Sequence, residues 1–249
     1  MGFQIEGAVA LVTGANRGIG EALVDALFAK GAAKVYAGAR QVSELAALQA
    51  RHGDKLVPLR LDVTQAAEIQ AAAERAQDVT LLINNAGVAA HMSQDFADPS
   101  WLSAGRVEMD VNYFGTLQMM QAFAPILGRN GGGGIANVSS VASLVSFPPF
   151  MSYSASKSAT HSVTQATRLV LAAQRTQVFG IYPGPVDTRM AEHVPFEKAS
   201  PALVAQTMVR EIEAGVQDIF PDPIAQEFGR IWRGEPKALE AHVAQMMAA

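Results

Sequence analysis

Cysteine is absent from the 249 residues of this chain. Its absence excludes disulfide bonds, thiol nucleophiles and thiolate metal ligands, and it fits a reducing compartment. Charge is sparse as well, because Asp, Glu, Lys and Arg make up only 17% of the residues and leave a net charge of −4. We therefore expect no binding surface for nucleic acid or for an anionic membrane.

Long apolar runs and targeting segments are also missing. No apolar run approaches the length that a transmembrane helix needs, and the start Met1–Glu6 holds no basic or signal-like apolar stretch. No His-x-x-x-His pair suggests a catalytic zinc site, so we expect no metal. These absences predict a cytoplasmic protein that binds neither membrane nor nucleic acid.

Apolar residues, by contrast, form 49% of the chain and suit a sizeable buried core. Neither an internal repeat nor a break in composition divides the sequence, so we predict one catalytic domain over residues 1–249. Residues 189–199 lack a clear periodicity, and we expect a substrate-binding lid around residues 189–215.

Short apolar segments alternate with helical patterns along the chain. The expected strands are Ala8–Thr13, Lys34–Ala39, Leu56–Leu61, Thr80–Ile83, Gly134–Val138, Gln177–Tyr182 and Gln217–Phe220. Expected helices include Ser43–His52, Thr64–Ala76, one that begins at Pro99, a longer one over Val107–Leu127, and one from Tyr153 to about Ala173. This alternation indicates βαβ units and a mainly parallel sheet.

A glycine-rich loop joins the first expected strand to the first expected helix. It reads Gly14-Ala-Asn-Arg-Gly18-Ile-Gly20. Glycines in this place allow a tight turn and let the backbone approach a pyrophosphate, which then lies on the amides of the helix N-terminus. The spacing differs from the commonest dinucleotide fingerprint, G-x-G-x-x-G, and a plain turn is the alternative interpretation.

The end of the second expected strand bears on the choice of cofactor. Dinucleotide folds often place an acidic residue there for the adenosine ribose, but this chain has Ala39 followed by Arg40. A guanidinium suits a 2′-phosphate, and Arg17 adds a second positive charge. The pattern favours NADP(H) over NAD(H), the alternative being two solvated surface arginines.

A proton-transfer pair lies after the fifth expected strand. Tyr153 and Lys157 are four residues apart, so on a helix they share one face. An ammonium beside the phenol favours the phenolate and lowers the tyrosine pKa. Ser140, at the end of the strand, can donate a hydrogen bond to the oxygen that exchanges a proton with Tyr153. Tyr-x-x-x-Lys alone is a weak motif, and an exposed surface helix is the alternative.

The ordered set of motifs resembles the short-chain dehydrogenase/reductase family over nearly the whole chain. The matching segments are Thr13–Gly20, Asp62-Val63, Asn84–Gly87, Asn112, Ser140, Tyr153-x-x-x-Lys157 and Pro183-Gly184 with Thr188. The resemblance implies an α/β fold: a Rossmann-type doubly wound parallel sheet of seven strands in the order 3-2-1-4-5-6-7, flanked by helices on both faces. It also implies NAD(P)(H) bound across the carboxyl ends of the strands.

Four catalytic residues follow from the resemblance. Tyr153 would be the acid in carbonyl reduction and the base in alcohol oxidation, and Lys157 would lower its pKa and hold the nicotinamide ribose. Ser140 would polarise the substrate oxygen, and Asn112 would complete a water-linked proton relay to Lys157.

The resemblance implies a cofactor site too. Asp62 and Val63 would contact the adenine, Asn84 the adenosine ribose, and Val186 and Thr188 the carboxamide. The full predicted set is Gly14, Asn16, Arg17, Gly18, Ile19, Gly20, Arg40, Asp62, Val63, Asn84, Ala86, Gly87, Tyr153, Lys157, Pro183, Gly184, Val186 and Thr188.

The predicted substrate pocket is mostly apolar and partly aromatic, which favours a hydrophobic or aryl ketone or aldehyde. Its expected members are Ser140, Val141, Leu144, Phe150, Tyr153, Met190 and His193; ordinary core or subunit packing is the alternative for the apolar ones.

Two rival functions stay open. A 3-oxoacyl-[acyl-carrier-protein] reductase would share the catalytic set and would need basic residues around its cleft, for which Arg129, Arg168 and Arg175 are candidates. A non-catalytic NADP-sensing regulator would not need Ser140, Tyr153 and Lys157 together. The resemblance also suggests a homotetramer or homodimer, with the long helices after Asn112 and Tyr153 as contact surfaces.

Overall fold

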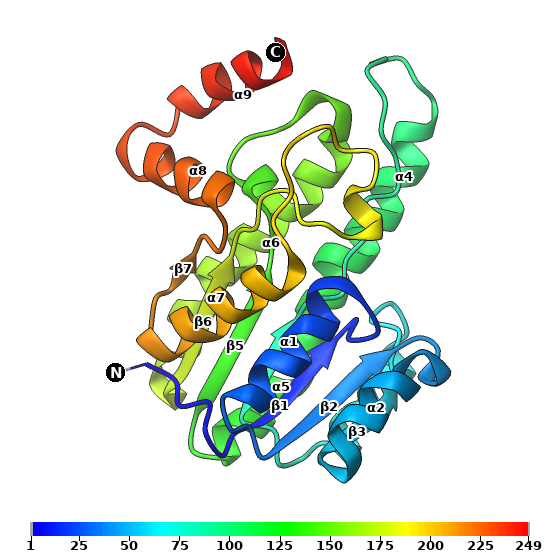
Figure 1. Ribbon diagram of the computed structural model, residues 1–249, viewed down its shortest axis with the longest axis vertical. Coiled ribbons are helices and arrows are strands. Elements are labelled where there is room, and N and C mark those ends of the chain that lie inside the picture. Colours follow the sequence, from blue (N-terminus) through cyan, green and yellow to red (C-terminus); the bar gives the residue numbers. More distant parts are fainter. Residues whose placement is uncertain (1, 249) are drawn as a thin grey trace.

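A single parallel sheet organises the chain in the computed structural model, which describes residues 2–248. Its seven strands follow the order β3-β2-β1-β4-β5-β6-β7, so the predicted sheet is confirmed (Figure 1). The strands are β1 (Val9–Thr13), β2 (Lys34–Ala39), β3 (Leu56–Arg60), β4 (Leu81–Asn84), β5 (Gly133–Val138), β6 (Thr176–Ile181) and β7 (Asp218–Ile219).

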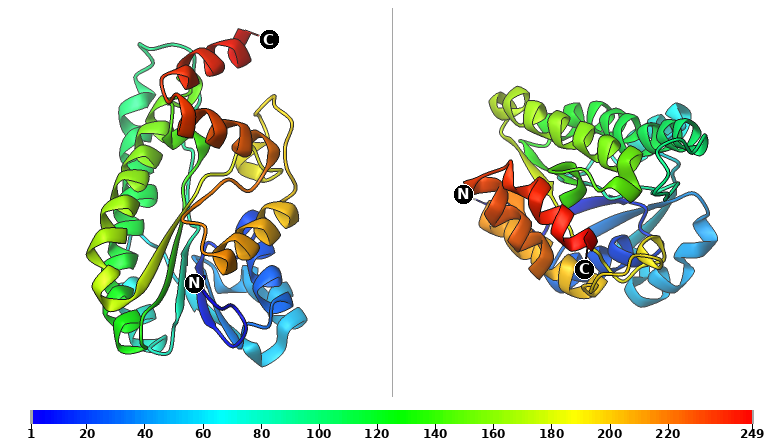
Figure 2. Two further views of the ribbon diagram at one scale, coloured as in Figure 1. Left: turned by 90° about the vertical axis from the view of Figure 1, so that its left-hand side faces the viewer. Right: turned by 90° about the horizontal axis from the view of Figure 1, so that it is seen from above.

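Helices connect successive strands, as βαβ units require, and the last two helices follow β7. They are α1 (Gly18–Ala29), α2 (Ala46–His52), α3 (Ala66–Arg75), α4 (Ser100–Glu108), α5 (Thr116–Arg129), α6 (Met151–Val170), α7 (Pro201–Ala214), α8 (Pro223–Gly234) and α9 (Ala238–Ala248). Figure 2 shows α4, α5 and α6 over one face of the sheet and α1, α2 and α7 over the other.

Both faces of the sheet are buried. On one face, Phe123 of α5 clusters with Ile135 of β5. On the other face, Leu27 of α1 and Met208 of α7 cluster with Phe179 of β6. All five side chains are fully buried. This two-sided burial explains why the strands are nearly continuous apolar runs and show no alternation with polar residues.

The helix between β4 and β5 differs from the prediction. The sequence suggests one helix from Pro99 and a separate one over Val107–Leu127. In the structure, α4, a π-helical segment (Met109–Gly115) and α5 follow one another without a break. Within the π turn, the Asn112 carbonyl oxygen accepts hydrogen bonds from the hydroxyls of Thr116 and Thr160. Turns of this kind are rare and are frequent at functional sites.

Helix α7 belongs to the layer that covers the sheet. Ser200 caps its N-terminus by accepting a hydrogen bond from the Leu203 amide, and Pro201 occupies the first turn. Its buried face packs against α1. Of the expected lid at residues 189–215, the part without an α-helix is therefore residues 189–200, and its role as a lid stays a prediction.

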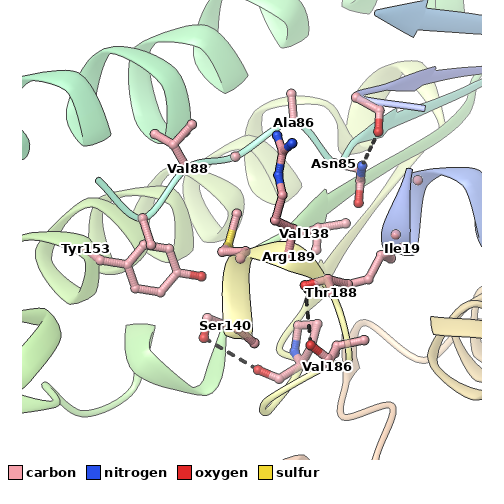
Figure 3. Close-up of a pocket in the computed structure, with 18 of the residues that line it drawn as sticks. Ile19, Asn85, Ala86, Val88, Val138, Ser140, Tyr153, Val186, Thr188 and Arg189 are labelled. Carbon is pink, nitrogen blue, oxygen red and sulfur yellow. Dashed lines mark hydrogen bonds between the residues drawn. The ribbon is translucent and has the colours of Figure 1, made fainter. Parts of the chain in front are cut away.

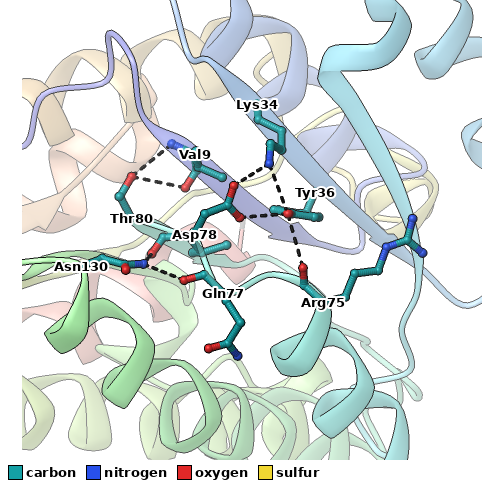
Figure 4. Close-up of polar contacts among 9 residues, drawn as sticks. Val9, Lys34, Tyr36, Arg75, Gln77, Asp78, Thr80 and Asn130 are labelled. Carbon is teal, nitrogen blue, oxygen red and sulfur yellow. Dashed lines mark hydrogen bonds and ion pairs between the residues drawn. The ribbon is translucent and has the colours of Figure 1, made fainter.

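Polar contacts join the segments at the amino ends of the strands (Figure 4). The Tyr36 hydroxyl donates to Asp78 Oδ1 over 2.9 Å, and Lys34 forms an ion pair with Asp78. The Thr80 hydroxyl contacts both the amide and the carbonyl of Val9. These contacts fix the end of the sheet that lies opposite the strands' carboxyl edge.

No helix in residues 2–248 combines the length and the apolar character that crossing a membrane demands.

The buried position of Leu127 predicts a large stability loss on truncation. Leu127 in α5 is fully buried against the sheet, so Leu127→Ala should lower the free energy of unfolding by about 2–5 kcal/mol. Urea denaturation checks this value. The matched control is Leu102→Ala in α4, because Leu102 is 77% exposed and its truncation should change the stability little. Equal losses in the two variants would contradict the predicted packing of α5.

Candidate active site

A cavity of about 770 Å³ lies at the carboxyl edge of the sheet. It is lined by the segments that follow β1, β4, β5 and β6. Strands β1 and β4 are neighbours in the sheet, but the strands that follow β1 lie on one side of this pair and those that follow β4 lie on the other. Open α/β sheets bind ligands at such a switch in strand order. Figure 3 shows Tyr153 and Ser140 away from Ile19 and Asn85, so the cavity has a catalytic end and a glycine-loop end.

The glycine loop forms a narrow cradle at one end of the cavity. Gly14 has a φ of 64°, in the left-handed region that favours glycine. A side chain on Gly20 would overlap the carbonyl oxygen of Gly14 and the Asn85 amide. The loop can therefore bring its backbone amides close to a pyrophosphate, at the N-terminus of α1. Gly18 and Ile19 line the same cavity, as the sequence predicts.

Asn85 fastens this loop to the neighbouring strand. Its side-chain nitrogen donates to the carbonyl oxygens of Thr13 (2.9 Å) and Gly14 (3.2 Å). The Thr13 hydroxyl accepts from the amides of Asn85 and Ala86. Asn84, which is predicted to contact the adenosine ribose, is buried and donates to Asn137, whereas its neighbour Asn85 lines the cavity.

Arginines gather at the outer end of the glycine loop. The predicted residues Asn16, Arg17, Arg40, Asp62 and Val63 all line the main cavity. A second, polar cavity of about 550 Å³ adjoins it. Arg189 lines both cavities, and Arg60, which pairs with Glu68, lines the second. The pairing of Ala39 with Arg60 between β2 and β3 brings Arg60 beside Arg40, a neighbourhood visible only once the register is known.

The catalytic end brings together three of the predicted residues. Tyr153, in the first turn of α6, lines the cavity with Ser140 and Lys157. Ser140 follows β5, and its oxygen accepts from the Ala142 amide over 3.1 Å, which fixes the hydroxyl at the start of a short helical turn. Its hydroxyl also lies 3.4 Å from the Pro183 carbonyl oxygen.

Burial controls the protonation of the tyrosine. Removal from water raises the pKa of Tyr153 to about 12, while Ser140 acts to lower this pKa and the charge of Glu108 raises it further. Burial therefore outweighs the groups that lower this pKa, because it disfavours the charged phenolate, and the ligand-free protein keeps the Tyr153 hydroxyl protonated. That Lys157 lowers the pKa of Tyr153 stays a prediction.

Lys157 is buried beside the tyrosine and has one protein partner. Its Nζ donates to the Val138 carbonyl oxygen over 2.9 Å and lies 5.7 Å from the centre of the Tyr153 ring. Burial lowers the pKa of Lys157 to about 8, because the low-dielectric surroundings disfavour the ammonium. The remaining N–H groups of the side chain are available to a ligand in the cavity.

Asn112 lies behind the cavity wall. Its Oδ1 accepts from the Val88 amide, and its Nδ2 donates to the Val88 carbonyl and to the Ser156 hydroxyl, each over 2.9 Å. A side chain on Gly87 would reach both Asn112 Oδ1 and Lys157 Nζ, at 3.2 and 3.3 Å. The absence of a side chain there leaves space between these two groups, and a water-linked relay through it stays a prediction.

The segment after β6 closes the middle of the cavity. The predicted residues Pro183, Gly184, Val186 and Thr188 all line it. The Gly184 amide donates to the buried Asp222, and the Thr188 hydroxyl donates to the Val186 carbonyl over 3.3 Å. Figure 3 shows the hydrogen bond between Thr188 and Val186, which lies midway along the cavity.

The expected substrate residues are divided between two places. Val141, Phe150, Met190 and His193 line the cavity. Leu144 packs instead beside a third apolar cluster that includes α8 and α9, and it is not part of the lining. Phe147, Val194 and Phe196 are additional lining residues, so the catalytic end is largely apolar.

The arginines considered for an acidic carrier protein lie elsewhere. Arg129 ends α5 and Arg175 precedes β6, both at the amino ends of the strands. Arg168 binds the Val178 carbonyl and Asp218. None of the three lines the cavity.

The family assignment rests on a comparison with known proteins. A family model described as short chain dehydrogenase matches residues 8–198. The chain belongs to this family. It is therefore an oxidoreductase that uses a nicotinamide cofactor and acts on a small molecule.

Similar short-chain dehydrogenases have been named or solved. A 3-alpha-(or 20-beta)-hydroxysteroid dehydrogenase of Mycobacterium bovis is 34% identical over 208 residues, which cover 82% of this chain and 78% of that protein. A short chain dehydrogenase of Burkholderia cenocepacia, solved in complex with NADP, is 41% identical with a TM-score of 0.88 and covers 96% of this chain and 98% of its own.

Another solved relative bears on the choice of cofactor. The 3-ketoacyl-(acyl-carrier-protein) reductase of Brucella melitensis, complexed with NADH, is 25% identical with a TM-score of 0.74 and covers 89% of this chain and 93% of its own. Because relatives of this short-chain dehydrogenase are seen with either dinucleotide, the family alone does not decide between NADP and NAD.

The cradle predicts the effect of a methyl group in the glycine loop. Gly20→Ala should weaken NADPH binding by about tenfold or more, because its Cβ would overlap the Gly14 carbonyl oxygen and distort the loop on which the pyrophosphate would lie. Titration of NADPH fluorescence measures this affinity. Gly234→Ala is the matched control, since nothing lies within 4 Å of its Cβ. Unchanged affinity in Gly20→Ala would show that the nucleotide does not bind against this loop.

Proposed function

We propose that the chain is an NADP(H)-dependent ketoreductase and alcohol dehydrogenase that interconverts a hydrophobic or aryl ketone or aldehyde and its alcohol. The observation that carries this proposal is the meeting of Ser140, Tyr153 and Lys157 at the apolar end of the cavity. A proton donor and a hydrogen-bond donor thus face a space in which a carbonyl group can lie.

The cavity fits the cofactor. The side-chain-free cradle at Gly14 and Gly20 leaves room for a pyrophosphate, and the remaining length of the cavity reaches the catalytic end. Arg17 and Arg40, with Arg60 and Arg189 nearby, line the polar cavity at the opposite end. Guanidinium groups suit the extra 2′-phosphate of NADP(H), which supports a preference for it over NAD(H).

The proposed reaction divides the work between the cofactor and the chain. Bound NADPH supplies the hydride that the carbonyl carbon receives. Ser140 donates a hydrogen bond to the carbonyl oxygen, and Tyr153 gives its phenolic proton to that oxygen, so that the product is the alcohol. Lys157 donates to the ligand and stabilises the phenolate that the proton transfer leaves. In alcohol oxidation the same groups act in reverse.

The apolar lining supports a hydrophobic substrate. Val141, Phe147 and Phe150 come from the segment between β5 and α6, and Met190 and Phe196 come from residues 189–200. A side chain of the substrate that is apolar or aromatic would bury its surface against them. Residues 189–200 would act as a lid that covers this part of the cavity.

The assembly and location of the protein are parts of the same proposal. Exposed apolar residues occur on the helical segments suggested as contact surfaces: Phe114, Leu169 and Val170. Such residues support a homodimer or homotetramer formed through these helices. We also propose a cytoplasmic location.

Loss of the phenolic hydroxyl tests the proton donor. Tyr153→Phe should lower kcat for ketone reduction by about a thousandfold, because it removes the proposed donor of the proton to the carbonyl oxygen. NADPH affinity should stay within about threefold of wild type. A panel of aryl and aliphatic ketones, assayed with NADPH and with NADH, provides the measurement. Near-normal turnover would refute the role, and NADPH binding without oxidation across the panel by the wild type would favour a regulator.

Reversal of charge at Arg40 tests the cofactor preference. Arg40→Asp should lower kcat/KM for NADPH relative to NADH by about a hundredfold, because a carboxylate repels the 2′-phosphate and suits a free ribose hydroxyl. The two kcat/KM values are measured with one ketone. Arg129→Asp, at the far end of the sheet, is the charge-matched control. An unchanged NADPH-to-NADH ratio would contradict the assignment of Arg40.

A further inference from the structure

Glu108 is a fully buried carboxylate that the reaction described above does not use. It is the last residue of α4. Its Oε1 accepts a hydrogen bond of 2.7 Å from the Ala90 amide. Its Oε2 is buried without a hydrogen-bond partner among the described residues, and so is the hydroxyl of Ser152, which precedes the catalytic tyrosine.

Its place in the helix pair brings Glu108 behind the active site. Helix α4 and the π-helical segment both pack against α6. A Cβ on Gly105 would lie 3.3 Å from Ser152, and Asn112 donates to Ser156. Glu108 is one turn from Gly105 and one turn from Asn112 on the same side of the helix. Glu108 therefore lies between the Gly105–Ser152 contact and the Asn112–Ser156 hydrogen bond, opposite the turn of α6 that carries Tyr153.

Glu108 and Asn112 together hold one wall of the cavity. Asn112 bonds both the amide and the carbonyl of Val88, and Glu108 bonds the amide of Ala90. Residues 87–89 line the cavity, and Figure 3 shows Val88 at the same end as Tyr153. Hydrogen bonds at Val88 and Ala90, two alternate residues, thus hold the 87–90 segment against the continuous helix of α4 and the π segment.

A wall contact alone does not explain a carboxylate at this position. One backbone hydrogen bond returns less free energy than the burial of a charged group costs. An amide side chain would accept the Ala90 hydrogen bond equally well, without a charge. The property that only Glu supplies is its negative charge.

We propose that Glu108 is a positioning residue of the active site, which fixes the 87–90 wall through Ala90 and places a negative charge behind Tyr153. This inference rests on the proposed function, because it assigns a consequence to the tyrosine's proton. A negative charge there favours the protonated phenol. It keeps Tyr153 protonated and raises the free energy of the phenolate, the form from which alcohol oxidation starts, so that oxidation requires a higher pH.

Other charged or titratable groups also lie near Tyr153. Lys157 lies on the same helix, and its positive charge favours the phenolate. From the segment after β6, Arg189 and His193 line the same cavity. Among the causes acting on the pKa of Tyr153, the charge of Glu108 acts in the same direction as burial. Removal of that charge should therefore lower the pKa of Tyr153.

Glu108→Gln separates the charge from the hydrogen bond. The variant keeps an acceptor for the Ala90 amide, so KM for the ketone should stay within about twofold of wild type. The pH profile of kcat for alcohol oxidation should shift towards lower pH by roughly half to one unit, because the phenolate forms more readily. Asp110→Asn, an exposed acidic residue in the following turn, should leave the profile unchanged. A Glu108→Gln profile that superimposes on wild type overturns the proposal.

Glu108→Ala removes both the charge and the acceptor. The Ala90 amide should then exchange with deuterium faster by about tenfold or more, as a buried donor without a partner becomes mobile. KM for the ketone should rise by about tenfold, while NADPH affinity stays within about twofold. Glu108→Gln should restore both the exchange rate and KM. Unchanged exchange at Ala90 in Glu108→Ala would overturn the positioning role.

The exchange measurement also separates this inference from the proposed function. It needs no substrate, and thermal unfolding of each variant shows whether the fold is intact. Faster exchange at Ala90 in an enzyme that reduces no carbonyl would support the wall contact and refute the proposed function. Activity with unchanged exchange and an unchanged pH profile would refute only the role of Glu108.

Discussion

The structure depends on the burial of one phenol and one amine beneath the carboxyl edge of the sheet. Burial raises the pKa of Tyr153 to about 12 and lowers that of Lys157 to about 8. The two shifts have the same cause, because both charged forms lose the solvation of water. The glycine loop, the strand ends and α6 bring these groups to one end of a long cavity, so that a ligand bound there replaces the missing water. In the ligand-free protein, burial therefore favours the neutral form of both groups, the phenol of Tyr153 and the amine of Lys157.

The helices behind the cavity matter as much as the residues that line it. The continuous unit of α4, π segment and α5 presents Glu108 and Asn112 to the cavity wall at residues 87–90 and to α6. The helical segments that hold this wall also pack against α6, which carries Tyr153, so this packing would keep the proposed carbonyl pocket and Tyr153 in register. Such support from residues that do not touch the substrate is what a preorganised site requires.

Most of the fold could be predicted from the sequence, because its signals are local. Apolar segments that alternate with helical patterns indicate the βαβ units. The resemblance of the ordered motifs to the family implies the strand order and the places of Ser140, Tyr153 and Lys157. The rest depends on contacts between distant segments. The side-chain directions of Asn84 and Asn85 at the end of β4 follow from the strand's orientation in the sheet, and the register of β3 with β2 places Arg60 at the polar cavity. The π turn, the burial of Glu108 and the raised Tyr153 pKa arise from packing that no short pattern records.

The most direct test of this account is the ionisation of Tyr153 itself. The ultraviolet difference between wild type and Tyr153→Phe, followed as the pH rises to about 11, reports this one phenol. The account predicts no ionisation of Tyr153 over that range in the ligand-free protein, and ionisation at lower pH once NADP⁺ brings a positive charge to the cavity. Ionisation of Tyr153 below about pH 9 in the ligand-free protein, or no change on adding NADP⁺, would contradict it.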